Sequence, residues 1–196
     1  MADDAQKLAN PAPLGLVGFG LTTVLLSLIN AGLLPKTGEN VVIPLAIAYG
    51  GTIQIIAGLL EFRLGNTFGT TAFLSYGAFW WWFALLLLLG GNHVLPLEGT
   101  GTTIGAALIL WGVLTMYLWV CTFKLTRALW WIFFTLWIAF YLLGFGALLG
   151  VGGLSLAGGW VGLVCGGLAM YTSFAIVANT TFGREVLPVG AKPMAG

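Results

Sequence analysis

The chain has 196 residues, of which 59% are hydrophobic and only 7% are charged, and its formal net charge is +1. Soluble domains carry about 25% charged residues, so this composition argues strongly against a water-soluble globular enzyme. The small net charge also gives no basic patch for nucleic acid. Cys121 and Cys165 lie inside apolar runs, without disulfide or metal-ligand spacing, and are interpreted as small packing residues.

Apolar segments dominate the chain, and each is long enough to cross a bilayer, which requires about 20 residues in a helix. Strands of a membrane barrel would be about 10 residues long and would alternate in polarity, which these segments do not. We therefore predict an all-α integral membrane protein, a bundle forming a single transmembrane domain over residues 1–196, with no secretory signal peptide. The six predicted spans are Leu14–Leu33, Val41–Leu60, Phe68–Leu89, Thr102–Phe123, Ala128–Leu149 and Leu156–Ala178.

Positively charged residues set the expected orientation, because Lys and Arg are retained on the cytoplasmic side of a membrane. The two termini and the second and fourth connections lie on one side of a six-span chain. The other side holds only Lys36. This asymmetry predicts that both termini lie in the cytoplasm, on the side of Lys7, Arg63, Lys124, Arg127, Arg184 and Lys192.

Polar residues inside the spans fall on narrow stripes, and in a membrane such residues cost free energy unless they are partnered or functional. The stripes combine Phe19, Thr23, Ser27 and Asn30 in the first span with Gly50, Gln54, Ala57 and Glu61 in the second. One interpretation is hydrogen bonding between helices; the other, which we favour for the set, is a shared passage. The residues predicted to offer polar groups to a substrate there are Thr23, Gln54, Ser75, Tyr171 and Asn179.

The start of the first span and the end of the second carry further candidates. Asn10, Pro11 and Pro13 form a helix start, which is either a cap alone or an anion-attracting pore mouth. Glu61 is the only carboxylate near a span and hence the sole candidate for proton coupling, the alternative being an ion pair with Arg63 or hydrogen bonds to neighbouring helix ends. No catalytic set, metal-ligand spacing or nucleotide motif is present, so we expect no enzyme activity, metal or cofactor.

Three stretches carry a resemblance to a known family: Asn10–Leu16 (NPAPLGL) with Gly18-Phe19-Gly20, the run Ala57–Trp80, and Phe182–Gly190 (FGREVLPVG). Together they resemble the acetate uptake transporters, the YaaH-like succinate–acetate permeases. Unlike the family pattern, the third to fifth spans here are rich in tryptophan, with Trp81, Trp82, Trp130 and Trp131.

The resemblance implies transport of acetate, other small monocarboxylates or succinate across the cytoplasmic membrane. It implies a fold similar to the urea channels and a homo-hexamer, each protomer with its own central path. It also implies a hydrophobic constriction formed by Phe19, Tyr76 and Leu136, and a role for Ala169 in substrate size.

For the mechanism, uncharged hydroxyl and amide donors replace part of a carboxylate's hydration shell, and no cation lies at mid-span to hold the anion too tightly. We therefore expect an anion channel or facilitator. The alternatives are a proton-coupled acetate symporter, a channel for a neutral solute such as urea or a small amide, and a non-transporting membrane scaffold.

Overall fold

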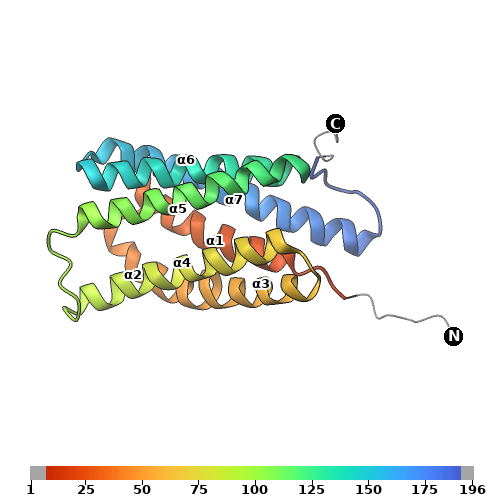
Figure 1. Cartoon of the computed structure of the whole chain (residues 1–196), viewed down its shortest axis with the longest axis horizontal. Helices are drawn as coiled ribbons and strands as arrows, with labels where there is room; N and C mark the ends of the chain where they lie inside the picture. The colour runs from red at the N-terminus through yellow and green to blue at the C-terminus, as the bar shows by residue number, and fades with distance from the viewer. Residues whose placement is uncertain (1–7, 191–196) are drawn as a thin grey trace.

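The computed structural model describes residues 8–190, so Lys7 and Lys192 lie outside the described part. Its long helices run side by side along the long axis of the molecule (Figure 1), and six helical segments are long and apolar enough to cross a membrane. The helices are α1 (Ala12–Asn30), α2 (Glu39–Leu45), α3 (Gln54–Arg63), α4 (Thr67–Gly91), α5 (Gly101–Cys121), α6 (Arg127–Leu149) and α7 (Gly152–Phe182), with 3-10 turns at Lys36–Gly38 and Thr122–Lys124.

The six helical segments that are long and apolar enough to cross a membrane lie where the six spans were predicted, with ends within five residues of the predicted bounds. The second span differs in kind, because α2 and α3 are joined by a π-helical segment, Ala46–Ile53. This segment follows Pro44, which has no N–H to donate to the helix. Its Gly50 packs against Thr22 of α1 and Trp80 of α4, since a Cβ there would lie 2.9 Å from both side chains. The widened turn thus lies where three helices approach closely.

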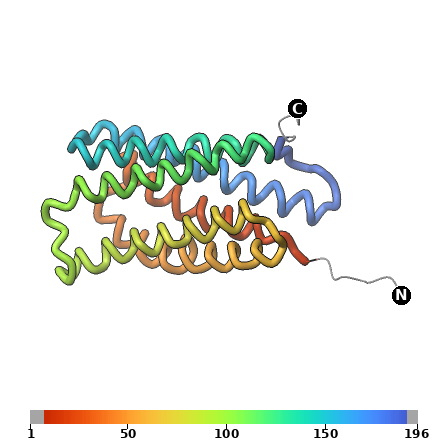
Figure 2. The backbone as a smooth tube through the Cα atoms, viewed as in Figure 1, coloured from red at the N-terminus to blue at the C-terminus, as the bar shows by residue number. Residues whose placement is uncertain are grey.

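The long helices pack mainly in pairs. α3 packs on α4, α5 packs on α6, and α1 packs along α7, which also packs on α6 (Figures 1 and 2). Contact between α1 and α7 is close because Gly166 lies against the backbone of Gly20, where a Cβ would come within 2.9 Å of a carbonyl oxygen. By contrast, α4 makes few backbone contacts with α5. The space between α4 and the second half of the bundle is therefore filled by side chains.

Aromatic side chains fill much of that space. The Tyr76 ring of α4 lies 6.1 Å from Phe133 and 6.5 Å from Phe140 of α6, and 5.8 Å from Phe19 of α1. Phe79, one turn further along α4, meets Phe140 edge to face at 5.2 Å. These rings come from three different spans, so the centre of the bundle is lined by apolar side chains that rotate about single bonds rather than by closely packed backbone.

Candidate transport path

A row of cavities runs along the bundle between α1, α4 and α6. At the end where the described chain begins and finishes lies the terminal cavity, with a volume of about 240 Å³. Next come the neck, of about 20 Å³, and the middle chamber, of about 50 Å³. The far vestibule, of about 270 Å³, lies at the opposite end.

Successive cavities share wall residues, which places them on one line. The terminal cavity and the neck share Leu16, Ala72, Phe73 and Phe133. The neck and the middle chamber share Phe19 and Leu136. The middle chamber and the far vestibule share Leu26, Asn30, Phe79 and Leu143.

The neck contains all three residues expected at the constriction. Phe19, Tyr76 and Leu136 come from α1, α4 and α6, line the neck together, and are 6%, 3% and 5% exposed. A volume of about 20 Å³ holds about one water molecule, so an organic acid passes only if these side chains move. The Tyr76 hydroxyl donates at 3.0 Å to Thr115 Oγ1, which itself donates to the Trp111 carbonyl at 2.7 Å.

Among the side chains that line the cavities, four carry buried polar atoms without a hydrogen-bond partner in the protein: Gln54, Thr23, Trp80 and Glu61. Gln54 lines the neck, is 1% exposed, and its Oε1 has no partner. Thr23 lines the middle chamber, and its Oγ1 also has no partner. Leaving such an atom unpaired costs about 1–3 kcal/mol. Gln54 thus stands in the wall of the neck and Thr23 in the wall of the middle chamber.

Three predicted polar residues are not on this path. Ser75 is half-buried and lines none of the four cavities. Tyr171 is 37% exposed, and its hydroxyl donates to the Pro188 carbonyl at 2.8 Å. Asn179 accepts from the N–H groups of Val186 and Leu187 and donates to the Leu187 carbonyl. The polar atoms of Tyr171 and Asn179 thus bond to the chain that follows α7, and neither residue lines the four cavities.

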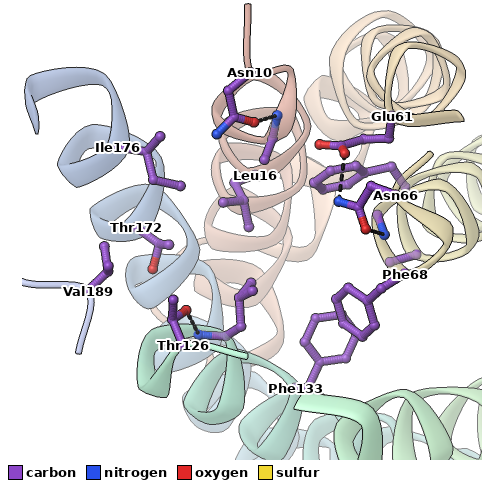
Figure 3. A pocket seen from close by; sticks show the side chains of 15 residues that line it. Asn10, Leu16, Glu61, Asn66, Phe68, Thr126, Phe133, Thr172, Ile176 and Val189 are labelled. Atoms are coloured by element: carbon purple, nitrogen blue, oxygen red, sulfur yellow. Dashed lines mark hydrogen bonds between the residues drawn. The ribbon is translucent and has the colours of Figure 1, made fainter. Parts of the chain in front are cut away.

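That returning segment, Gly183–Gly190, is here called the C-terminal strap. Besides its bonds to Tyr171 and Asn179, the Val189 carbonyl accepts from the Ala128 N–H at the start of α6 at 3.0 Å. Val189 also lines the terminal cavity, and Figure 3 shows it near Thr172 of α7. The strap is thus a wall of the path that the polar pattern of the spans did not indicate.

Glu61 lies in the wall of the terminal cavity and is 2% exposed. Its Oε2 accepts from Asn66 Nδ2 at 2.7 Å, while its Oε1 has no partner (Figure 3). Asn66 in turn caps α4 by accepting from the Gly69 N–H at 3.1 Å. Of the two structural alternatives, the ion pair with Arg63 is absent from the described residues. The hydrogen bond to a neighbouring helix end is present, and one oxygen remains free beside the cavity.

The start of α1 combines capping with a place at the cavity wall. Asn10 Oδ1 accepts from the Ala12 N–H at 3.0 Å, and Asn10 also lines the terminal cavity. Pro11 is buried, and the Pro13 carbonyl accepts from the Ser173 hydroxyl of α7 at 2.7 Å, which fixes the helix start against α7. Sequence reasoning missed Thr126, which lines the same cavity and caps α6; a threonine just before a predicted helix was the available signal.

Ala169 and two of the additional tryptophans, Trp130 and Trp131, line none of the four cavities. Ala169 is fully buried on α7 but lines none of the four cavities. Trp130 stacks on Phe134 at 4.9 Å and meets Trp131 edge to face at 4.7 Å, away from the path. Trp82, by contrast, lines the far vestibule. The additional tryptophans therefore lie in two different places: Trp130 and Trp131 pack in an aromatic cluster with Phe134, and Trp82 lies in a cavity wall.

Six membrane-spanning helices around a row of cavities, interrupted by an aromatic neck, define a membrane protein with the architecture of a narrow channel or carrier. The chain matches the GPR1/FUN34/yaaH family over residues 2–190 and belongs to that family.

The chain is also similar to proteins whose transport function is named and to a solved structure. The chain is 45% identical over 191 residues to the succinate-acetate/proton symporter SatP of Escherichia coli K12, covering 94% of this chain and 96% of that protein. It is 39% identical over 204 residues to acetate permease A of Emericella nidulans, covering 97% and 68%. The solved structure of the bacterial acetate channel SatP superposes with a TM-score of 0.90 at 44% identity, covering 94% of this chain and 100% of that one. The resemblance found in the sequence motifs and the predicted fold class are thereby confirmed.

Proposed function

We propose that this protein transports acetate and related small carboxylates, succinate among them, as an anion channel or facilitator. The observation that carries the proposal is the row of cavities that meets at the Phe19–Tyr76–Leu136 neck. Two relatives are named for acetate or succinate transport, and a third for an acetate channel. A protein that only scaffolds other membrane components has no use for such a row.

The polar groups beside the neck address the main physical obstacle. A carboxylate is ionised at neutral pH, and moving an ion out of water is prohibitive without compensation. Gln54 and Thr23 lie next to the narrowest point, where the Thr23 hydroxyl, which has no partner in the protein, and the NH2 group of the Gln54 amide are hydrogen-bond donors for a carboxylate. They are uncharged, so they replace part of the hydration shell without holding the anion too tightly for release.

The neck then acts as a filter for size and apolar character. Its walls are mostly apolar side chains, and the polar groups among them are the Gln54 amide and the Tyr76 hydroxyl, which already donates to Thr115. A methyl group is accommodated among such side chains at little cost, whereas a hydrated inorganic anion must give up water that nothing there replaces. Larger acids require a greater displacement of Phe19 and Leu136, since the resting space holds about one water molecule.

The experiment compares labelled acetate and succinate uptake into proteoliposomes for the wild type, Phe19→Ala and Tyr76→Phe. Phe19→Ala removes a neck wall, so we expect the succinate-to-acetate ratio to rise. Tyr76→Phe is the matched control, because it keeps the ring and removes only the hydroxyl that bonds Thr115. Unchanged ratios in Phe19→Ala count against the neck as the filter, and absence of acetate flux in the wild type refutes the function itself.

A proton-coupled symporter is the second candidate, favoured by the free Oε1 of Glu61 at the terminal cavity. Glu39 and Glu61 are the only carboxylates in the spanning helices of residues 8–190, at opposite ends of the second span, and these helices contain no histidine, so a multistep proton relay has few groups to use. Glu61→Gln decides the matter. If pH-driven acetate uptake disappears while the protein stays folded, the symporter is correct; if uptake persists, its proton dependence comes from protonation of the substrate.

A channel for a neutral solute, such as urea or a small amide, is distinguished from an acetate channel by competition. We expect unlabelled acetate, and not urea, to reduce the flux of labelled acetate.

We further propose that residues 1–196 form one transmembrane domain in the cytoplasmic membrane, with both termini in the cytoplasm and the terminal cavity facing inward. We propose a homo-hexamer surrounded by lipid, without enzyme activity or cofactor. Among residues 8–190 no group of three or more His, Cys, Asp or Glu side chains is placed to hold a metal ion.

A further inference from the structure

The far vestibule contains an ion pair that the proposed path does not yet use. Lys36 Nζ lies 2.6 Å from Glu39 Oε1, and both residues line the vestibule. It is the only ion pair among residues 8–190. The rest of the wall is apolar apart from Asn30 and Ser155. An anion entering from this end therefore meets one positive charge, and that charge is already paired with a carboxylate.

The two partners of this pair are held very differently. The side chain of Glu39 is 20% exposed and begins α2, where a negative charge is favourable near the helix N-terminus. The side chain of Lys36 is 79% exposed and stands on a single 3-10 turn, Lys36–Gly38. Such solvent-exposed pairs are weak, because water and salt screen them and long side chains lose freedom. Lys36 is therefore free to exchange Glu39 for another carboxylate at little cost.

A line of polar side chains leads from this pair to the neck. Asn30 lines both the far vestibule and the middle chamber. Ser27 and Thr23, on the same face of α1, continue through the middle chamber, and Thr23 Oγ1 has no partner in the protein. His93 and Glu98 line a separate hollow in the loop, which shares only Leu97 with the vestibule.

We propose that Lys36 captures the carboxylate of the transported acid at the far mouth, and that Glu39 is the built-in competitor that holds the ammonium until a substrate carboxylate replaces it. This inference rests on the proposed function. The site takes small monocarboxylates and dicarboxylates, recognised by charge alone, and delivers them to Asn30. Glu39 acts only through Lys36, so it sets how readily the site fills and not how fast the neck conducts.

The test measures initial acetate influx against acetate concentration for the wild type, Lys36→Gln, Glu39→Gln and the double variant, at low and high ionic strength. At low salt we expect Lys36→Gln to raise KM about two- to fivefold, as befits a single steering charge. Glu39→Gln lowers KM, the maximal rate stays unchanged in both, and the double variant matches Lys36→Gln. At high salt the differences shrink, since screening shortens the reach of the charge.

Several results would overturn the inference. Equal KM values in the wild type and Lys36→Gln exclude capture by Lys36. A raised KM in Glu39→Gln, or a double variant that differs from Lys36→Gln, excludes Glu39 as a competitor. If Glu39 serves only to stabilise α2, Glu39→Gln lowers the melting temperature and the maximal rate while KM stays fixed.

Failure of the proposed function looks different. In that case the wild type shows no acetate influx at all, and no KM exists to compare. The inference about Lys36 is then tested by acetate binding to the protein in detergent micelles. Binding is measured as NMR saturation transfer from the protein to the acetate methyl group. Capture requires a signal in the wild type that is reduced in Lys36→Gln, and equal signals reject it.

Discussion

The contact between α1 and α7 at Gly159 gives a test of the fold in which geometry sets the outcome. A Cβ at Gly159 would lie 2.5 Å from the carbonyl carbon of Asn30 and closer still to the backbone nitrogen of Ala31. Real Cβ contacts essentially never fall below 3.0 Å. Both neighbours are backbone atoms, which cannot rotate away. Gly159→Ala therefore forces the two helices apart by at least about 0.5 Å in a well-packed region.

The expected cost follows from two opposing contributions. Overpacking of this kind costs about 1–3 kcal/mol, and the rigid neighbours place Gly159→Ala towards the upper end. Replacing glycine by alanine inside a helix returns about 1 kcal/mol. The net loss is about 1–2 kcal/mol, and a chain of this size loses about 2–4 °C in melting temperature for each kcal/mol. We therefore expect a decrease of several degrees.

Gly167→Ala is the matched control on the same helix, because nothing lies within 4 Å of its added Cβ. Only the propensity gain applies there, so its melting temperature should equal or exceed that of the wild type. Tryptophan fluorescence during heating in detergent micelles measures both variants. If Gly159→Ala has the melting temperature of the wild type, or if the melting temperatures of both variants decrease by the same amount, the argument from close α1–α7 packing is wrong.

Three further predictions follow from single contacts. Thr115→Val leaves the Tyr76 hydroxyl unpartnered in a buried site and should cost about 1–3 kcal/mol in thermal unfolding; adding Tyr76→Phe should recover most of the loss, and no recovery contradicts the assignment. Asn179→Ala removes three hydrogen bonds to the C-terminal strap and should speed limited proteolysis within residues 183–190, whereas Tyr171→Phe, which removes one, should do so less. Gln54→Leu should lower acetate flux at least tenfold in proteoliposomes without changing the melting temperature, and wild-type flux would show that the amide does not serve the path.

Much of the fold could be predicted from the sequence, because a membrane span is a property of local length and composition. The π-helical segment Ala46–Ile53 could not, since its wide turn depends on how Gly50 meets Thr22 and Trp80 from other spans. Periodicity assigns a residue to a face, but it does not say which neighbour that face meets.

The site illustrates the same limit. Gln54 and Thr23, which the polar stripes singled out, line the neck and the middle chamber, and Phe19, Tyr76 and Leu136 lie together in the neck. Tyr171 and Asn179 lie on a comparable stripe and yet bind the chain that follows α7. A polar side chain near a helix end serves equally well as a solute contact or as an anchor for a returning segment. Only the three-dimensional structure separates the two.

The C-terminal strap changes where the functional unit ends. The last hydrophobic helix stops at Phe182, but the wall of the terminal cavity is completed by Val189, beyond that helix. A truncation placed after Phe182, the natural choice for a minimal design or a chimera, would remove part of the cavity wall and strip Asn179 of its partners. Fusion partners and tags should therefore be attached after Gly190, because the C-terminal strap forms part of the cavity wall together with the helices of the bundle.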